Sequence, residues 1–188
     1  MSGRIMGKRT RAFNGQETRP GMDREMLRAL QAPLKQKYRD TPDSGRVQAR
    51  AVAHLDAAGA CTVRTWAGDA KAGLHPATGG DGTMACAADM MMEALVACAG
   101  VTLTSVAAAM GVTLRKASVR AEGTWDARGT LGVSRDVPVG LTSVRLLFDL
   151  DTDADEAKRQ RLVELTERYC VVLQTFRQPP QTSAALAS

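Results

Sequence analysis

The sequence of residues 87–110 is AADMMMEALVACAGVTLTSVAAAM, and Asp89 and Glu93 are its only ionisable carboxylates. Ala, Leu and Met favour a helix, and Gly111 follows at the position where helices commonly stop. The two acids, the Thr and Ser residues of the second half and the lack of flanking Lys or Arg argue against a membrane span. A helix that is apolar all round must be covered on all sides. We therefore expect a buried central helix wrapped by sheet, with Cys98 inside or at the edge of the wrapping.

The positive charge of the chain is concentrated at its N-terminal end. Residues 1–50 contain twelve Lys or Arg and five Asp or Glu, whereas residues 51–188 contain thirteen and fifteen. We expect residues 1–21 to form a disordered basic tail. The nearly neutral body and the seven aromatic residues argue against a nucleic-acid partner. We expect no membrane partner, and a cytoplasmic protein with mostly reduced cysteines, because the N-terminus lacks the apolar run of a signal peptide.

Residues 22–45 are predicted to form a helical arm. Apolar residues recur there at helical spacing from Met26 to Tyr38, Asp23 is placed to cap the helix, and Pro33 is expected to kink or split it. The TPDSG turn at 41–45 then ends the arm.

Residues 46–188 are predicted to form one α+β domain, because stretches with a period of two alternate with helical stretches. Thr152 or Asp153 is expected to cap a helix that leads to Cys170, and Asp153 with Glu156 has the spacing of a capping box. The segment after Cys170 could add a last edge strand. The expected strands are 46–55, 60–66, 116–125 and 141–150, with a loop at 68–83 and a connection at 127–138.

Two stretches of this domain resemble the OsmC/Ohr family of hydroperoxide-reducing proteins. They are GLHPATGGDGTMACAADMMMEALVACAGVTLTSVAAAMGV at 73–112 and LTERYCVVLQTF at 165–176. The family has a glycine-rich loop, an acid near the start of a buried helix, a cysteine within that helix and a second cysteine after a later helix. The resemblance implies an intertwined homodimer whose sheets enclose two central helices, with active sites where the subunits meet.

The resemblance also implies roles for individual residues. Cys98 falls on the family's peroxide-attacking cysteine and Cys170 on its resolving partner. The family's proline-x-glutamate motif is absent, so Asp89 is the candidate replacement for its acid, and Val171 stands where a proline usually follows the second cysteine. Arg64 is our candidate for the arginine that activates the thiol. The implied partners are an organic hydroperoxide and a dithiol reductant, of the lipoyl type in the family, with no metal or organic cofactor.

The residues around Cys98 explain why it would need such help. A thiol with apolar neighbours, about three turns into a helix, should have a raised pKa, because burial disfavours the thiolate and the helix dipole is too distant. We therefore expect a cation to be brought to Cys98 and an acid to hold that cation in place, with Arg64 as the candidate cation and Asp89 as the candidate acid. Asp89 projects from the helix face opposite Cys98, so it could act only through a long arginine or a distorted first turn.

Other interpretations remain open at this stage. Cys98 could be an inert core cysteine, and Cys61 shares the inward parity of a strand, which favours packing. Cys86 could be a third redox thiol, and His75 an exposed loop histidine or an acid/base group. A zinc site built from His75 and the cysteines lacks the usual ligand spacing. The alternative function is an OsmC-like dimer that binds a hydrophobic ligand without efficient peroxide turnover.

Overall fold

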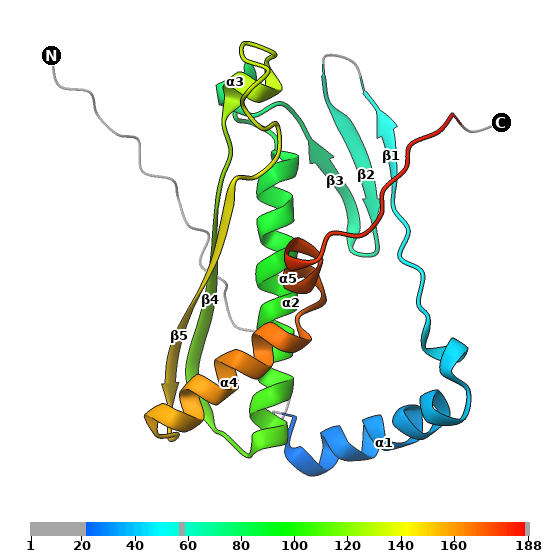
Figure 1. The fold of residues 1–188 in the computed structure, drawn as a ribbon, viewed down its shortest axis with the longest axis vertical. Coiled ribbons are helices and arrows are strands. Elements are labelled where there is room, and N and C mark those ends of the chain that lie inside the picture. Colours follow the sequence, from blue (N-terminus) through cyan, green and yellow to red (C-terminus); the bar gives the residue numbers. More distant parts are fainter. Residues whose placement is uncertain (1–21, 57–58, 187–188) are drawn as a thin grey trace, which may run out of the picture.

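The computed structural model describes residues 22–56 and 59–186, and its centre is the helix α2 (Ala87–Met110), shown in Figure 1. Gly111 ends α2 in the left-handed conformation, with φ of 63°. Its N–H donates to the carbonyl groups of Ala107 and Ala108, and glycine suits this stop because it adopts the left-handed conformation without a Cβ clash. The predicted central helix is therefore confirmed residue for residue.

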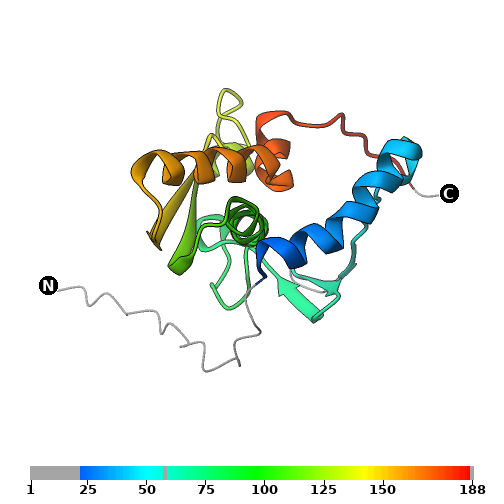
Figure 2. The ribbon, with the colours of Figure 1, turned by 90° about the horizontal axis from the view of Figure 1, so that it is seen from below.

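Two antiparallel sheets lie on opposite sides of α2 (Figures 1 and 2). The strands β4 (Leu114–Thr124) and β5 (Ser143–Thr152) form a long ribbon, in which Val119 pairs with Phe148 and Ala121 with Leu146. The smaller sheet has the order β1 (Val52–Leu55), β2 (Cys61–Thr65), β3 (Gly68–Ala72). The predicted α+β class with antiparallel pairs is confirmed.

Helices α4 (Glu156–Tyr169) and α5 (Val171–Arg177) complete the core beside α2. Leu162 of α4 is fully buried against Leu103 and Val106 of α2, with Phe148 of the ribbon packed on the same cluster. A second cluster joins α2 to α5 and contains Leu95, Ala99, Cys170 and Leu173. These contacts agree with the prediction of which side chains of the two ribbon strands face the core.

The arm helix α1 (Arg24–Asp40) and three short segments make up the rest. Asp23 caps α1 as expected, and its carboxylate accepts from the Met26 N–H at 2.8 Å. Of the two expected effects of Pro33, a kink or a split, the split does not occur, because the helix runs through Pro33 without a break. The other segments are the 3₁₀ turns η1 (Pro42–Gly45) and η2 (Pro76–Thr78), and α3 (Ala127–Thr130) within the connection.

Three sequence predictions are corrected by the strands and by the last segment. The first part of the predicted loop is the strand β3, which pairs with β2 through a two-residue turn; its small residues had suggested a loop. The first strand begins at Val52 rather than at residue 46. The predicted edge strand after Cys170 is the helix α5, because Val172, Leu173 and Phe176, at positions i, i+1 and i+4, pack on the cluster that contains Leu95 and Ala99 of α2.

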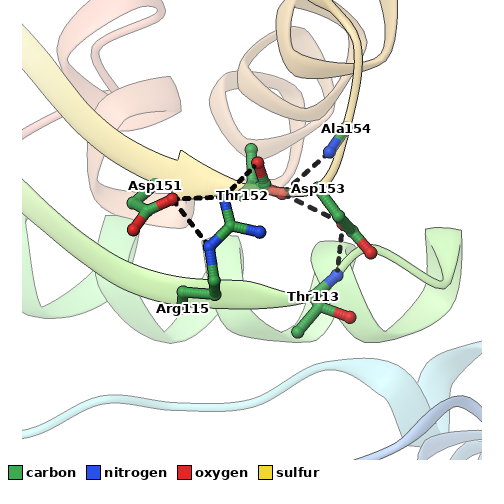
Figure 3. A network of polar contacts seen from close by, with 6 residues as sticks. All are labelled: Thr113, Arg115, Asp151, Thr152, Asp153 and Ala154. Carbon is green, nitrogen blue, oxygen red and sulfur yellow. Dashed lines mark hydrogen bonds and ion pairs between the residues drawn. The ribbon is translucent and has the colours of Figure 1, made fainter.

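The predicted capping box is also wrong, since α4 begins two residues later than expected. Asp155 is the cap, and its carboxylate accepts from the Lys158 N–H at 2.7 Å. Asp153 instead accepts from the Thr113 N–H at 3.1 Å, which ties the end of β5 to the start of β4 (Figure 3). This contact holds the pKa of Asp153 below its usual value, and Arg115 adds an ion pair to Asp151.

Helix α2 is only partly covered within one chain. Just 28% of its most apolar 18-residue window is buried, although the helix is long and apolar enough by composition to cross a membrane. Core helices of soluble proteins share these properties, and α2 packs against β4, α4 and α5. A single chain thus leaves uncovered much of the helix that we expected to be buried.

Candidate thiol site

The structure brings Cys98 and Cys170 together. Cys98 is half-buried on α2, and it packs against the cluster that contains Cys170, a residue with 0% exposure. Cys170 ends α4 and starts α5: its N–H donates to the Thr166 carbonyl and its carbonyl accepts from the Gln174 N–H, both at 2.9 Å. The change of direction between the two helices therefore places the second thiol beside the first.

The start of α5 lowers the pKa of Cys98. Burial alone would raise this pKa, but the Val172 N–H, the Cys170 thiol and the Val171 N–H all donate to the sulfur, and the net shift is downward. The Thr102 hydroxyl is also close to the sulfur, yet it donates to the Cys98 carbonyl at 2.7 Å, so the other three donors account for the stabilised thiolate.

The pKa of Cys170 moves in the opposite direction. Burial raises it, and the thiolate of Cys98 raises it further, because Cys170 donates its proton to that sulfur and a second negative charge would be repelled. The Leu173 and Val172 N–H groups offset only part of this rise. The pair is thus divided into a half-exposed thiol that ionises first and a buried thiol that keeps its proton.

Neither of the two other predicted site residues contacts this pair within one chain. Arg64 is exposed on β2, where it lies opposite Val52 of β1 and Asp69 of β3. Asp89 is exposed in the first turn of α2, nine residues and about 14 Å along the axis from Cys98. Within residues 22–56 and 59–186, no hydrogen bond or ion pair joins Arg64 or Asp89 to Cys98.

A family model for OsmC-like proteins matches residues 80–184, a range that contains α2, both ribbon strands, α4, α5 and the two thiols. This match covers more than half of the chain. The chain belongs to the OsmC-like family. No curated protein sequence matches it significantly.

Solved structures show that this OsmC-like chain has the family fold. An OsmC-like protein from Mycoplasma pneumoniae is 15% identical, with a TM-score of 0.61, and the alignment covers 71% of this chain and 89% of that one. An OsmC-like protein of unknown function from Vibrio cholerae is 13% identical, with a TM-score of 0.57 and coverages of 69% and 94%. An organic hydroperoxide resistance protein OsmC from Legionella pneumophila is 17% identical, with a TM-score of 0.50 and coverages of 71% and 93%. At these identities the likeness concerns the fold alone.

The remaining cysteines of this OsmC-like chain lie away from the pair. Cys86 precedes α2 by one residue, which puts it about 18 Å along the helix axis from Cys98, much too far for a disulfide. Cys61 is half-buried at the start of β2.

His75 precedes η2 as its cap, and its Nδ1 accepts from the Ala77 N–H at 3.0 Å. Across the described part of the chain, no three His, Cys, Asp or Glu side chains are grouped closely enough to hold a metal ion.

The groups that stabilise the Cys98 thiolate were not predicted from the sequence. The expected group was a cation, whereas the structure supplies backbone N–H groups at the start of α5. The segment VVLQTF begins with two β-branched residues, which favour strands, and this concealed the helix. Its apolar residues Val172, Leu173 and Phe176, at positions i, i+1 and i+4, were the signal that could have revealed it.

Proposed function

We propose that this chain reduces organic hydroperoxides, with Cys98 as the attacking thiol and Cys170 as the resolving thiol. The Cys98 thiolate attacks the terminal peroxide oxygen, the O–O bond breaks, and the alkoxide takes up a proton and leaves as an alcohol. Cys98 is then a sulfenic acid. The Cys170 sulfur attacks the Cys98 sulfur, the hydroxyl leaves as water, and a disulfide forms.

One observation carries this proposal: Cys98 packs against the cluster that contains Cys170, and the pKa values of the two thiols are shifted in opposite directions. An attacking thiol must be ionised and reachable, and Cys98 is the half-exposed thiol with the lowered pKa. A resolving thiol must lie within bonding reach of the first sulfur, and Cys170 donates its proton to that sulfur. An inert pair of core cysteines would need neither property.

We propose that the cycle closes by thiol–disulfide exchange with an external dithiol of the lipoyl type, in the reducing environment of the cytoplasm. No metal or organic cofactor has a step in this chemistry, because every bond change occurs at sulfur and oxygen.

We further propose that the working unit is a homodimer. Val101 on α2 is 69% exposed, and Ala94 and Ala97 extend the same uncovered apolar face of the helix. Leu55 and Val52 of β1 are 88% and 59% exposed. A second copy laid against these surfaces would complete the coverage that an apolar helix requires. It is also the setting in which Arg64 and Asp89 could reach a Cys98 thiol, as we propose for them.

Thiol titration tests the function directly. Addition of one equivalent of cumene hydroperoxide to the reduced protein should remove two thiols rapidly and release one equivalent of 2-phenyl-2-propanol. The Cys98→Ser variant should consume no peroxide, and Cys61→Ser should behave as the parent does. If the parent retained all four thiols under excess hydroperoxide, the function would instead be that of a binding dimer without peroxide turnover.

A further inference from the structure

A cavity of about 480 Å³ lies beside the first turns of α2, between η2, the end of β4 and α5. Sites for small organic molecules commonly have volumes of about 300–1,000 Å³ and mostly apolar walls. Neither Cys98 nor Cys170 lines this cavity, which separates it from the thiol site. Its apolar side chains are mainly Leu74, Met91, Trp125, Val139, Leu141 and Phe176.

The orientation of His75 in the cavity wall is fixed by two contacts. Its Nδ1 accepts from the Ala77 N–H at 3.0 Å, and its ring meets the ring of Trp125 edge to face at 5.3 Å. Because Nδ1 is an acceptor, a neutral ring carries its proton on Nε2 and can donate there. The Thr78 hydroxyl also lines the cavity, but it already donates to the His75 carbonyl at 3.0 Å. His75 is therefore placed as a hydrogen-bond donor to a bound molecule.

The charges of the wall restrict the ligand further. Among the residues that the structure describes, no Lys, Arg, Asp or Glu lines the cavity. A carboxylate or a phosphate buried there would lose its hydration without gaining a counter-charge, which is costly. A neutral molecule with a single hydrogen-bond acceptor loses little hydration free energy on entering the cavity, because His75 can replace the water that donates to that acceptor.

We propose that this cavity binds a neutral, apolar organic molecule that accepts a hydrogen bond from Nε2 of His75. Phe176 forms part of the wall and also packs against the cluster that contains Cys170, so this side chain links the cavity wall to the thiol site. The binding site does not depend on the peroxidase proposal, because it involves neither of these thiols.

Tryptophan fluorescence can report this binding. Trp66 is 100% exposed and Trp125 lines the cavity, so a Trp66→Phe variant leaves Trp125 as the only indole. A Cys98→Ser substitution in the same chain removes the proposed attacking thiol. Titration with 2-phenyl-2-propanol should give a saturable change in Trp125 emission. The anion 2-methyl-2-phenylpropanoate, of similar size, should bind at least tenfold more weakly.

Two further variants locate the binding site. Ala88→Leu places extra side-chain volume in the cavity wall and should weaken binding at least tenfold, whereas Ala157→Leu, at an exposed position on α4, should leave it unchanged. His75→Asn keeps an acceptor for the Ala77 N–H but lacks the Nε2 donor. This variant should bind the alcohol several-fold more weakly, and its affinity for cumene, which has no acceptor, should be unchanged. The proposal would be overturned by equal affinity for the alcohol and the carboxylate, or by unchanged affinity in both the Ala88→Leu and His75→Asn variants. It would also be overturned if the parent gave no saturable signal because a second copy fills the cavity.

Discussion

Replacing Val171 by proline should make Cys98 react more slowly, because it removes one N–H that donates to the Cys98 sulfur. The position suits proline. Val171 is the first residue of α5, where an N–H has no partner within the helix, and the preceding Cys170 has an extended conformation with φ −74° and ψ 104°. The Val171 side chain is 71% exposed, so its loss removes little packing. The substitution therefore deletes a hydrogen bond and leaves the helix in place.

The expected size of the effect follows from the donors that remain. Hydrogen bonds to charged groups contribute about 1.5–3 kcal/mol, and a sulfur acceptor places this one at the lower end. A loss of about 1.4 kcal/mol lowers the thiolate population about tenfold at a pH below the pKa of Cys98. The Val172 N–H and the Cys170 thiol still donate, so the pKa should rise without the site being lost.

The assay is the pH dependence of Cys98 alkylation by iodoacetamide, followed by mass spectrometry of the Cys98 peptide. Val171→Pro should shift the profile to higher pH and react about tenfold more slowly at neutral pH, by the same arithmetic. Val171→Ala keeps the N–H and serves as the matched control, with a profile like that of the parent. Identical profiles for the proline and alanine variants would refute the role of the Val171 N–H.

Three further predictions concern the core, a helix cap and the proposed arginine. Leu162→Ala should lower the free energy of unfolding by about 2–5 kcal/mol in a urea titration, because Leu162 is fully buried. Asp155→Ala should cost about 1 kcal/mol in the same assay through loss of the α4 cap, and a null effect would contradict that role. Arg64→Met should slow alkylation of Cys98 in the proposed dimer while unfolding stays unchanged; an unaltered pH profile would exclude Arg64.

Much of the fold could be predicted from patterns of period two and 3.6. The bounds of α2 followed from the apolar run and Gly111, and the parity of Val119 and Phe148 marked the ribbon face that meets α2. The predicted element boundaries near residues 68 and 153 were wrong because contacts with residues distant in the sequence decide the structure there. Small residues form β3 because β2 offers hydrogen-bond partners, and Asp153 binds the distant Thr113 N–H in place of capping the adjacent helix.

The thiol site was predictable only in part. Family resemblance suggested that Cys98 and Cys170 pair, across 72 residues of chain. No local pattern could show that the backbone at Val171 and Val172 would turn toward Cys98, since that depends on how α5 packs on α2. Because every residue except proline has a backbone N–H, such donors cannot be recognised from residue types, and Arg64 was therefore the predicted source of the stabilising charge.

The central claim is that Cys98 and Cys170 act as one redox pair, and peptide mapping without reductant tests it most directly. After brief treatment with one equivalent of cumene hydroperoxide, the parent protein should yield a peptide pair linked through Cys98 and Cys170. Cys170→Ser should instead hold a sulfenic acid on Cys98 that dimedone traps. Mapping that finds both thiols free, with peroxide still present in solution, would contradict the account.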